Sequence, residues 1–211
     1  MNKRKIGNIC IVLGVLLILG AGGLYTYNVL EERRADAAAN KIALELVDDL
    51  KEAPQETRPS GVMSEKDLYN QMTGVMDLTM DTVEIDGHEY IGLLSIPALE
   101  LQLPVMAEWS YPSLRIAPCR YIGSVGGNNL VIAGHNYKRH FGLLKTLGTG
   151  EEVIFTDVHN VTTVYEIMEI EEIAPTNIEG MTVSDFDLTL FTCTYGGRLR
   201  YTVRCSRKEL Q

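Results

Sequence analysis

A cysteine and a histidine each follow an apolar run and could together carry out nucleophilic chemistry. Cys193 ends the run 188–193 directly before Thr194-Tyr195-Gly196-Gly197, and His135 follows the run 129–133. A side chain at a strand end beside a turn can reach a substrate outside the core. A thiolate that attacks a carbonyl and an imidazolium that protonates the departing amine could perform acyl transfer through a thioester. The alternative for Cys193 is a buried cysteine with no chemical role.

The C-terminal segment offers a cation that could stabilise the oxyanion of such a reaction. Its residues alternate in polarity, so the two sets should occupy opposite faces of a strand. The apolar set is Leu199, Tyr201, Val203 and Cys205, and the polar set is Arg198, Arg200, Thr202 and Arg204. Cys205 is therefore interpreted as a small buried residue, whereas the arginines share a face that could line a site.

The other cysteines and histidines do not have the spacing of a metal site. The four cysteines, at positions 10, 119, 193 and 205, are too few and too scattered for a disulfide framework. A single disulfide bond between Cys119 and Cys205, formed outside the cell, remains an alternative to free thiols. The absence of CxxC and HExxH patterns gives a zinc site no support. We therefore expect neither a metal nor another cofactor.

Short β-like runs separated by turn residues fill the chain after about Asp81. With only brief helical intervals, such as 141–147, they favour a closed or nearly closed antiparallel barrel over a βαβ sheet. The expected strands are 90–96, 101–106, 129–133, 152–156, 163–170, 188–193 and 199–205.

The N-terminal 30 residues predict a transmembrane signal anchor (1–30). Lys3, Arg4 and Lys5 precede an apolar run over 9–25. A helix over 6–30 would exceed the roughly 30 Å of hydrocarbon in a bilayer. Basic residues before the span favour a cytoplasmic N-terminus and a catalytic domain outside the cell. A cleaved signal peptide is the alternative, although the glycine-rich stretch after the run is a poor cleavage site.

Residues 31–80 predict a helical stalk or linker before a domain at 81–211. The pattern over 35–52 is that of an amphipathic helix, and Pro54 and Pro59 break it. A second short helix is expected from Ser64. This region could hold the domain away from the membrane or pack against it.

Composition excludes several classes of protein. The chain has 211 residues, of which 45% are hydrophobic and 22% charged, so collagen-like, coiled-coil and wholly disordered chains are excluded. This length allows one domain plus accessory segments. After Arg34 the chain holds 14 basic and 26 acidic residues. Such an acidic domain is a poor candidate for binding nucleic acid.

Two segments form recognisable motifs, Thr189-Leu190-Phe191-Thr192-Cys193 and Ala133-Gly134-His135-Asn136. They resemble the T-L-x-T-C signature and the histidine motif of sortases, the membrane-anchored cysteine transpeptidases of Gram-positive bacteria. The segment 200–204 looks like their arginine-led final strand. The resemblance runs from about Tyr90 to the C-terminus. It implies a closed eight-stranded β-barrel with short helices and cleavage of an LPxTG-type sorting signal between Thr and Gly.

The resemblance also implies roles for individual residues. Cys193 would be the nucleophile, His135 the general acid and base, and Arg200 the group that stabilises the oxyanion. Arg198 and Arg204 stay open as alternatives to Arg200. Thr192 would contact the substrate, with a structural role as the alternative. The partners would be a sorting-signal peptide and an amine from peptidoglycan or a pilin.

The loop over 173–187 corresponds to one that helps to form the signal-peptide groove in sortases. Glu171 and Glu172 lie beside it, where one sortase class binds calcium, but we expect them to form a solvated strand edge. Two rival functions remain. An L,D-transpeptidase would use the same residue types, although its cysteine is expected in a Gly-Cys-x-Arg context. A membrane-tethered binding module would leave the Cys, His and Arg placements as coincidence.

Overall fold

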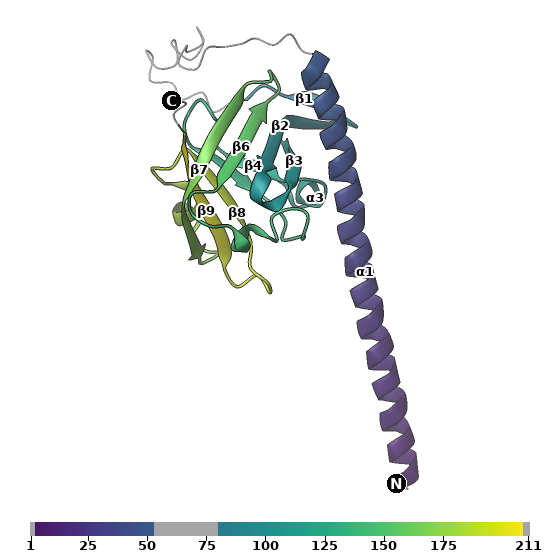
Figure 1. Ribbon diagram of the computed structural model, residues 1–211. Helices are drawn as coiled ribbons and strands as arrows, with labels where there is room; N and C mark the ends of the chain where they lie inside the picture. Colours follow the sequence, from purple (N-terminus) through teal and green to yellow (C-terminus); the bar gives the residue numbers. More distant parts are fainter. Residues whose placement is uncertain (1–2, 53–79, 209–211) are drawn as a thin grey trace. The chain divides into compact units, whose positions relative to one another are not determined.

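The computed structural model describes residues 3–52 and 80–208 (Figure 1). The helix expected from Ser64 lies outside these residues. By contacts the chain divides into two units, Met1–Ala35 and Asp36–Gln211. The second unit holds the β-structure and the residues singled out for chemistry.

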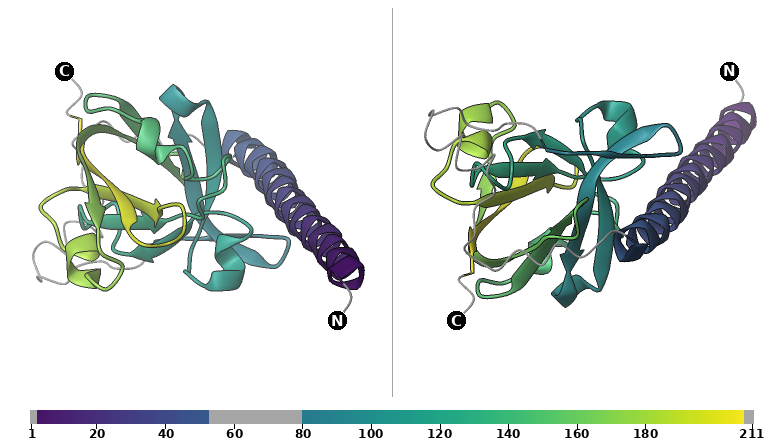
Figure 2. Two further views of the ribbon diagram at one scale, coloured as in Figure 1. Left: turned by 90° about the horizontal axis from the view of Figure 1, so that it is seen from below. Right: turned by 90° about the horizontal axis from the view of Figure 1, so that it is seen from above.

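Eight strands of the described residues close into a barrel (Figure 2). Around the ring they follow the order β2-β3-β4-β5-β8-β9-β7-β6, and β6 pairs with β2 to close it. A further strand, β1, pairs with β2. The closed eight-stranded barrel is confirmed. The strands are β1 (Val83–Ile85), β2 (His88–Ile96), β3 (Leu101–Met106), β4 (Cys119–Ile122), β5 (Leu130–Ala133), β6 (Glu152–Asp157), β7 (Thr162–Ile173), β8 (Leu188–Cys193) and β9 (Arg200–Arg207).

The expected antiparallel arrangement is wrong at two places. β4 runs parallel to β3, and β8 runs parallel to β5. Parallel neighbours need a long connection. The first contains α3 (Tyr111–Leu114), and the second contains β6 and β7. Strand pairing between distant segments sets these directions, so alternation within one segment does not reveal them.

The sequence pattern missed two short strands. β4 has the sequence Cys-Arg-Tyr-Ile directly after Pro118, and β1 has only three residues. Both are shorter than every run that predicted the other seven strands. The expected helical interval over 141–147 contains the short 3₁₀ helix η2 (Leu144–Thr146), and a second one, η1 (Pro97–Leu99), connects β2 to β3.

The barrel interior holds alternate residues of the strands that carry the site. Leu130 and Ile132 of β5, Leu188 and Leu190 of β8, and Val203 of β9 all belong to the main core cluster. Residues between them on each strand therefore face outward. Cys205 lies in this core, as predicted from its alternation.

Helix α1 (Lys3–Glu52) is continuous over both helical segments expected from the sequence. It contains the one stretch of the described residues, Ile11–Asp48, that is long and apolar enough to cross a membrane, consistent with a membrane anchor or a signal sequence. In the second unit it packs on the barrel. Ile42, Ala43 and Leu46 share a core cluster with Tyr90 and Leu93.

Two ion pairs accompany this packing. Lys41 Nζ lies 2.7 Å from Asp86 Oδ2 beside β1, and Arg139 Nε lies 3.0 Å from Asp36 Oδ2. Arg139 belongs to the loop that follows His135. The start of the barrel-packed part of α1 is therefore linked to that loop.

Candidate active site

Cys193 and Arg200 lie directly opposite each other at the turn end of the β8–β9 hairpin. The antiparallel register pairs Cys193 with Arg200, so their side chains emerge on the same face, with Cβ atoms about 4.5–5.5 Å apart. The turn between them is closed by the Thr194 amide, which donates to the Leu199 carbonyl over 3.0 Å. Gly196 and Gly197 have φ of 84° and 72°, a left-handed conformation that favours glycine. Cys193 is exposed and Arg200 is half-buried.

The parallel register of β5 and β8 brings His135 beside Cys193. Ala133 pairs with Phe191, and the Gly134 amide extends the ladder by donating to the Phe191 carbonyl over 3.0 Å. His135 lies two residues after Ala133, and Cys193 lies two residues after Phe191. The three residues proposed from the sequence thus occupy neighbouring positions at one edge of the barrel, on β5, β8 and β9.

Thr192 ties the cysteine strand to the histidine loop. It is buried, and its hydroxyl donates to the Gly134 carbonyl over 2.9 Å. Since neighbouring residues of a strand face opposite sides, Thr192 and Cys193 point away from each other. The Thr192 hydroxyl helps to hold the residue that precedes His135, and its contact with substrate stays a prediction.

The register separates the three candidate arginines. Arg198 is exposed in the β8–β9 turn. Arg204 is 3% exposed and lies four positions along β9 from Arg200. Arg200 pairs with Cys193, and its Nη1 donates to the carbonyls of Gly197 and Leu199 over 3.2 Å each. Of the three, Arg200 is the one that the register pairs with Cys193.

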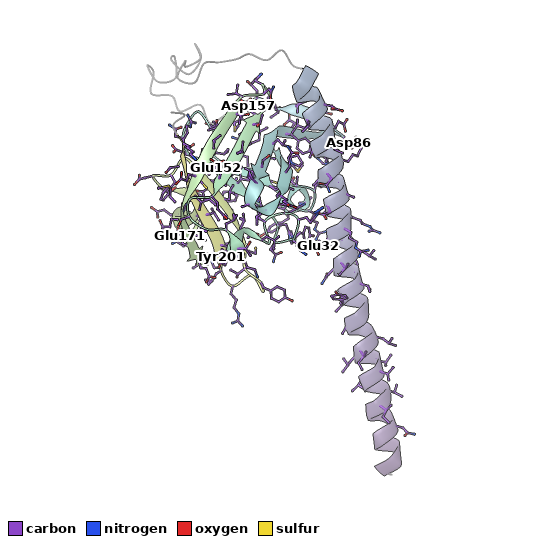
Figure 3. All side chains as sticks on the ribbon, viewed as in Figure 1. Glu32, Asp86, Glu152, Asp157, Glu171 and Tyr201 are labelled. Carbon is purple, nitrogen blue, oxygen red and sulfur yellow. The ribbon has the colours of Figure 1, made fainter. Side chains whose placement is uncertain are left out.

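Arg204 instead anchors the loop between β7 and β8. Its guanidinium donates to Glu171 Oε1 over 2.9 Å, to Thr189 Oγ1 over 3.0 Å and to the carbonyls of Met181 and Gly180. Met181 and Gly180 belong to α4 (Ile178–Thr182). Glu171, labelled in Figure 3, thus has an ion-pair partner on the neighbouring strand.

We expect Arg204→Leu to lower the free energy of unfolding by about 2 kcal/mol, because several buried polar groups lose their donor together. Urea titration followed by circular dichroism measures this. The matched control is Arg198→Leu, which should change the free energy of unfolding by less than about 0.5 kcal/mol because Arg198 is exposed. Equal stability of the two variants would contradict the anchoring role of Arg204.

The loop over 134–142 contains His135 and folds back on itself. A Cβ atom on Gly134 would lie 2.3 Å from the Phe141 ring, so this position requires glycine or a shift of Phe141. The Phe141 amide donates to the His135 carbonyl over 3.0 Å. The Tyr137 ring stacks on the His135 ring, and the ring of His140 meets Tyr137 edge-on. The sequence pattern singles out neither His140 nor Tyr137, because neither directly follows an apolar run.

The outer face that bears Cys193 carries apolar and aromatic side chains. Val131, Ala133 and Phe191 form a cluster there with Ile173 and Met181. Phe191 lies two residues before Cys193 on the same side of β8.

An aromatic series extends this face toward the segment after β3. The ring of Tyr121 lies edge-on to Phe191, with centroids 5.3 Å apart, and to Trp109, at 5.6 Å. Beside Trp109 and Tyr121 lies an open cavity of about 560 Å³, which Glu108 and Arg120 also line. Phe191 is buried beneath this series, whereas Tyr121 and Trp109 are partly exposed beside the cavity.

Cys119, Cys193 and Cys205 are free thiols in different environments. Burial raises the pKa of Cys119 and of Cys205 to about 12, whereas Cys193 is exposed. The buried thiols therefore stay protonated and inaccessible at pH 8.

We expect iodoacetamide to alkylate Cys193 and to spare Cys119 and Cys205 in the folded chain, as measured by peptide mass mapping. Urea should make all three reactive, and labelling of Cys205 at the rate of Cys193 without urea would contradict this arrangement.

Comparison with known proteins agrees with the geometry. The family profile described as "Sortase domain" matches residues 94–208. No curated protein matches the chain. Among solved structures, sortase C1 from Streptococcus agalactiae is 23% identical with a TM-score of 0.62, and the alignment covers 81% of this chain and 100% of that one.

Two further solved structures are similar. Sortase C1 from Streptococcus suis is 28% identical with a TM-score of 0.51, over 59% of this chain and 75% of that one. Sortase C from Clostridium perfringens, solved with the C-terminal cell wall sorting motif, is 20% identical with a TM-score of 0.54, over 84% of this chain and 95% of that one. With a sortase profile matching more than half of its length and a barrel of the same fold, this chain belongs to the sortase family of cysteine transpeptidases.

Proposed function

We propose that the chain cleaves an LPxTG-type sorting signal through a thioester on Cys193 and transfers the surface protein to an amine. The observation that carries this proposal is the register of β5, β8 and β9, which brings His135, Cys193 and Arg200 to one edge of the barrel. A similar solved structure, the C. perfringens sortase C, holds a C-terminal cell wall sorting motif.

In the first half of the reaction the Cys193 thiolate attacks the carbonyl carbon of the signal's threonine. The developing oxyanion receives hydrogen bonds from the Arg200 guanidinium, which faces the same side as the thiol. The protonated His135 ring gives its proton to the nitrogen of the departing glycine as the C–N bond breaks. The products are a thioester on Cys193 and a free amine on the released peptide.

In the second half an acceptor amine attacks the thioester. Neutral His135 takes the proton from the attacking nitrogen, an amide bond forms, and Cys193 leaves as a thiolate. The acceptor is an amine of the peptidoglycan cross-bridge or a lysine of a pilin. Arg200 stabilises the oxyanion in both halves because the tetrahedral centre lies at the same place.

The partly exposed rings of Trp109 and Tyr121, which line the cavity, suit the leucine and proline of such a signal. The Tyr121 ring also contacts Phe191, which lies two residues before Cys193. Burial of apolar side chains against this surface would supply binding energy close to the thiol.

The apolar part of α1 would hold the enzyme in the membrane. We assign residues 1–30 to a single transmembrane anchor, 31–80 to a stalk or linker and 81–211 to an extracellular catalytic domain. The apolar run within Ile11–Asp48 and the basic residues before it support this assignment.

The test is incubation of the full chain in detergent with a quenched LPxTG-type peptide library and an amine acceptor. We expect cleavage that needs a free thiol, together with a new product whose mass equals that of the N-terminal fragment plus the acceptor. Turnover of peptidoglycan stem peptides instead would favour an L,D-transpeptidase. Peptide binding without turnover would favour a binding module, and either result would overturn the proposal.

A further inference from the structure

The ring of Tyr137 lies flat on the imidazole of His135. The ring centroids are 3.8 Å apart and the planes differ by 14°. We propose that Tyr137 is a positioning residue, which fixes the plane of the His135 ring and favours its protonated form. The inference rests on the role proposed above for His135 and adds a residue to it.

The backbone of the loop fixes this stack. The Tyr137 carbonyl accepts hydrogen bonds from the amides of His140 over 3.0 Å and of Gly142 over 2.9 Å. A Cβ atom on Gly142 would lie 2.6 Å from the Asn136 carbonyl oxygen and 2.7 Å from that of Tyr137, so the chain doubles back tightly there. The His135 carbonyl accepts a hydrogen bond from the Phe141 amide in the same loop. The two rings are therefore kept together by a folded turn.

Stacking has two physical consequences for the imidazole. The flat contact leaves the His135 ring little room to rotate, which preserves its orientation relative to Cys193. The face of an aromatic ring also attracts a cation, so the stack is more favourable for the imidazolium than for the neutral ring. The first effect keeps the ring oriented for proton transfer. The second favours the protonated state, which donates a proton to the leaving amine.

Other charged groups around His135 come from several elements. By register, Cys193 of β8 lies beside it and Arg200 of β9 beside Cys193. On the loop itself, Arg139 is paired with Asp36 of α1. His140 is fully buried. Its pKa is lowered to about 4, mainly by this burial and to a smaller extent by the charge of nearby His135. His140 is therefore neutral at pH 7, and the Tyr137 ring contacts both this neutral imidazole and the one that must carry charge.

The experiment compares Tyr137→Phe, which keeps the ring, with Tyr137→Leu, which removes it. Histidine labelled with ¹³C in the full chain in detergent gives four ring signals to assign, from His88, His135, His140 and His159. The His135 pKa is measured by NMR titration in a Cys193→Ala background, and turnover of the LPxTG-type peptide is measured with Cys193 intact.

We expect Tyr137→Leu to lower the His135 pKa by about 0.5 and kcat by about fivefold, while Tyr137→Phe keeps both values close to those of the parent. A role confined to folding would not move the pKa of His135 in this pattern. The inference is overturned if the leucine variant keeps the parent values or if the phenylalanine variant loses as much as the leucine variant.

A direct measurement covers the case in which the leucine variant does not fold. In the unchanged chain the ring protons of His135 should be shifted upfield by the stacked Tyr137 ring, and the absence of that shift overturns the inference. If the shift and the pKa effect are present but no chain turns over the peptide, the stack stands and the proposed function fails.

Discussion

We expect Cys193→Ala to lower turnover of a sorting-signal peptide by roughly 10⁴-fold or more, because no other group in the site can form the thioester. Cys193 is exposed at the end of β8, so its replacement leaves no cavity in the core. The measurement is peptide cleavage followed by mass spectrometry, which also detects the covalent intermediate. The parent chain should show the acyl-enzyme mass in the absence of an acceptor amine, and the variant should not.

The matched control is Cys205→Ala. Cys205 lies in the barrel core, where loss of its sulfur should cost about 1 kcal/mol of stability and leave turnover within about twofold. A comparable loss of turnover in both variants would show that the thioester does not form on Cys193.

Arg200→Lys should lower kcat by about 10²-fold. A lysine ammonium keeps the positive charge but lacks the planar fork of donors that can hold the strand-turn carbonyls and the oxyanion together. In the structure one nitrogen of Arg200 donates to Gly197 and Leu199, which leaves the rest of the guanidinium for the substrate side. Steady-state kinetics at saturating peptide separates this effect on kcat from weaker binding.

Arg198→Lys is the control for charge. It removes a guanidinium two residues away, from an exposed turn position that is not paired with the cysteine, and should change kcat by less than about twofold. If Arg198→Lys is the damaging change, the oxyanion group comes from the turn and the role given to Arg200 is wrong.

The placement of Cys193 and His135 at the ends of neighbouring strands could be predicted in part from local patterns. Cys193 and His135 each follow an apolar run, and the alternation over 199–205 separated the buried Cys205 from the polar arginines. These patterns depend on neighbours in sequence, so they are readable without coordinates. The choice among Arg198, Arg200 and Arg204 could not be made in this way, because all three share one alternation and only the pairing with β8 distinguishes them.

Other features depend on contacts between distant segments. The parallel pairing of β5 with β8 follows from how β6 and β7 fill the long connection, and no residue within either strand encodes its direction. β4 has four residues, too few to show a period of two clearly. The stack of Tyr137 on His135 depends on a turn closed by Gly142, and the spacing of two residues alone does not predict it.

The barrel-packed part of α1 bears on how a soluble enzyme should be produced. Ile42, Ala43 and Leu46 cover Tyr90 and Leu93, which are otherwise apolar surface of β2. A shortened chain that begins at residue 81 would expose this surface to water and become prone to aggregation. A shortened chain that lacks the apolar N-terminal part of α1 should begin near Asp36. This start also keeps the ion pair between Asp36 and Arg139.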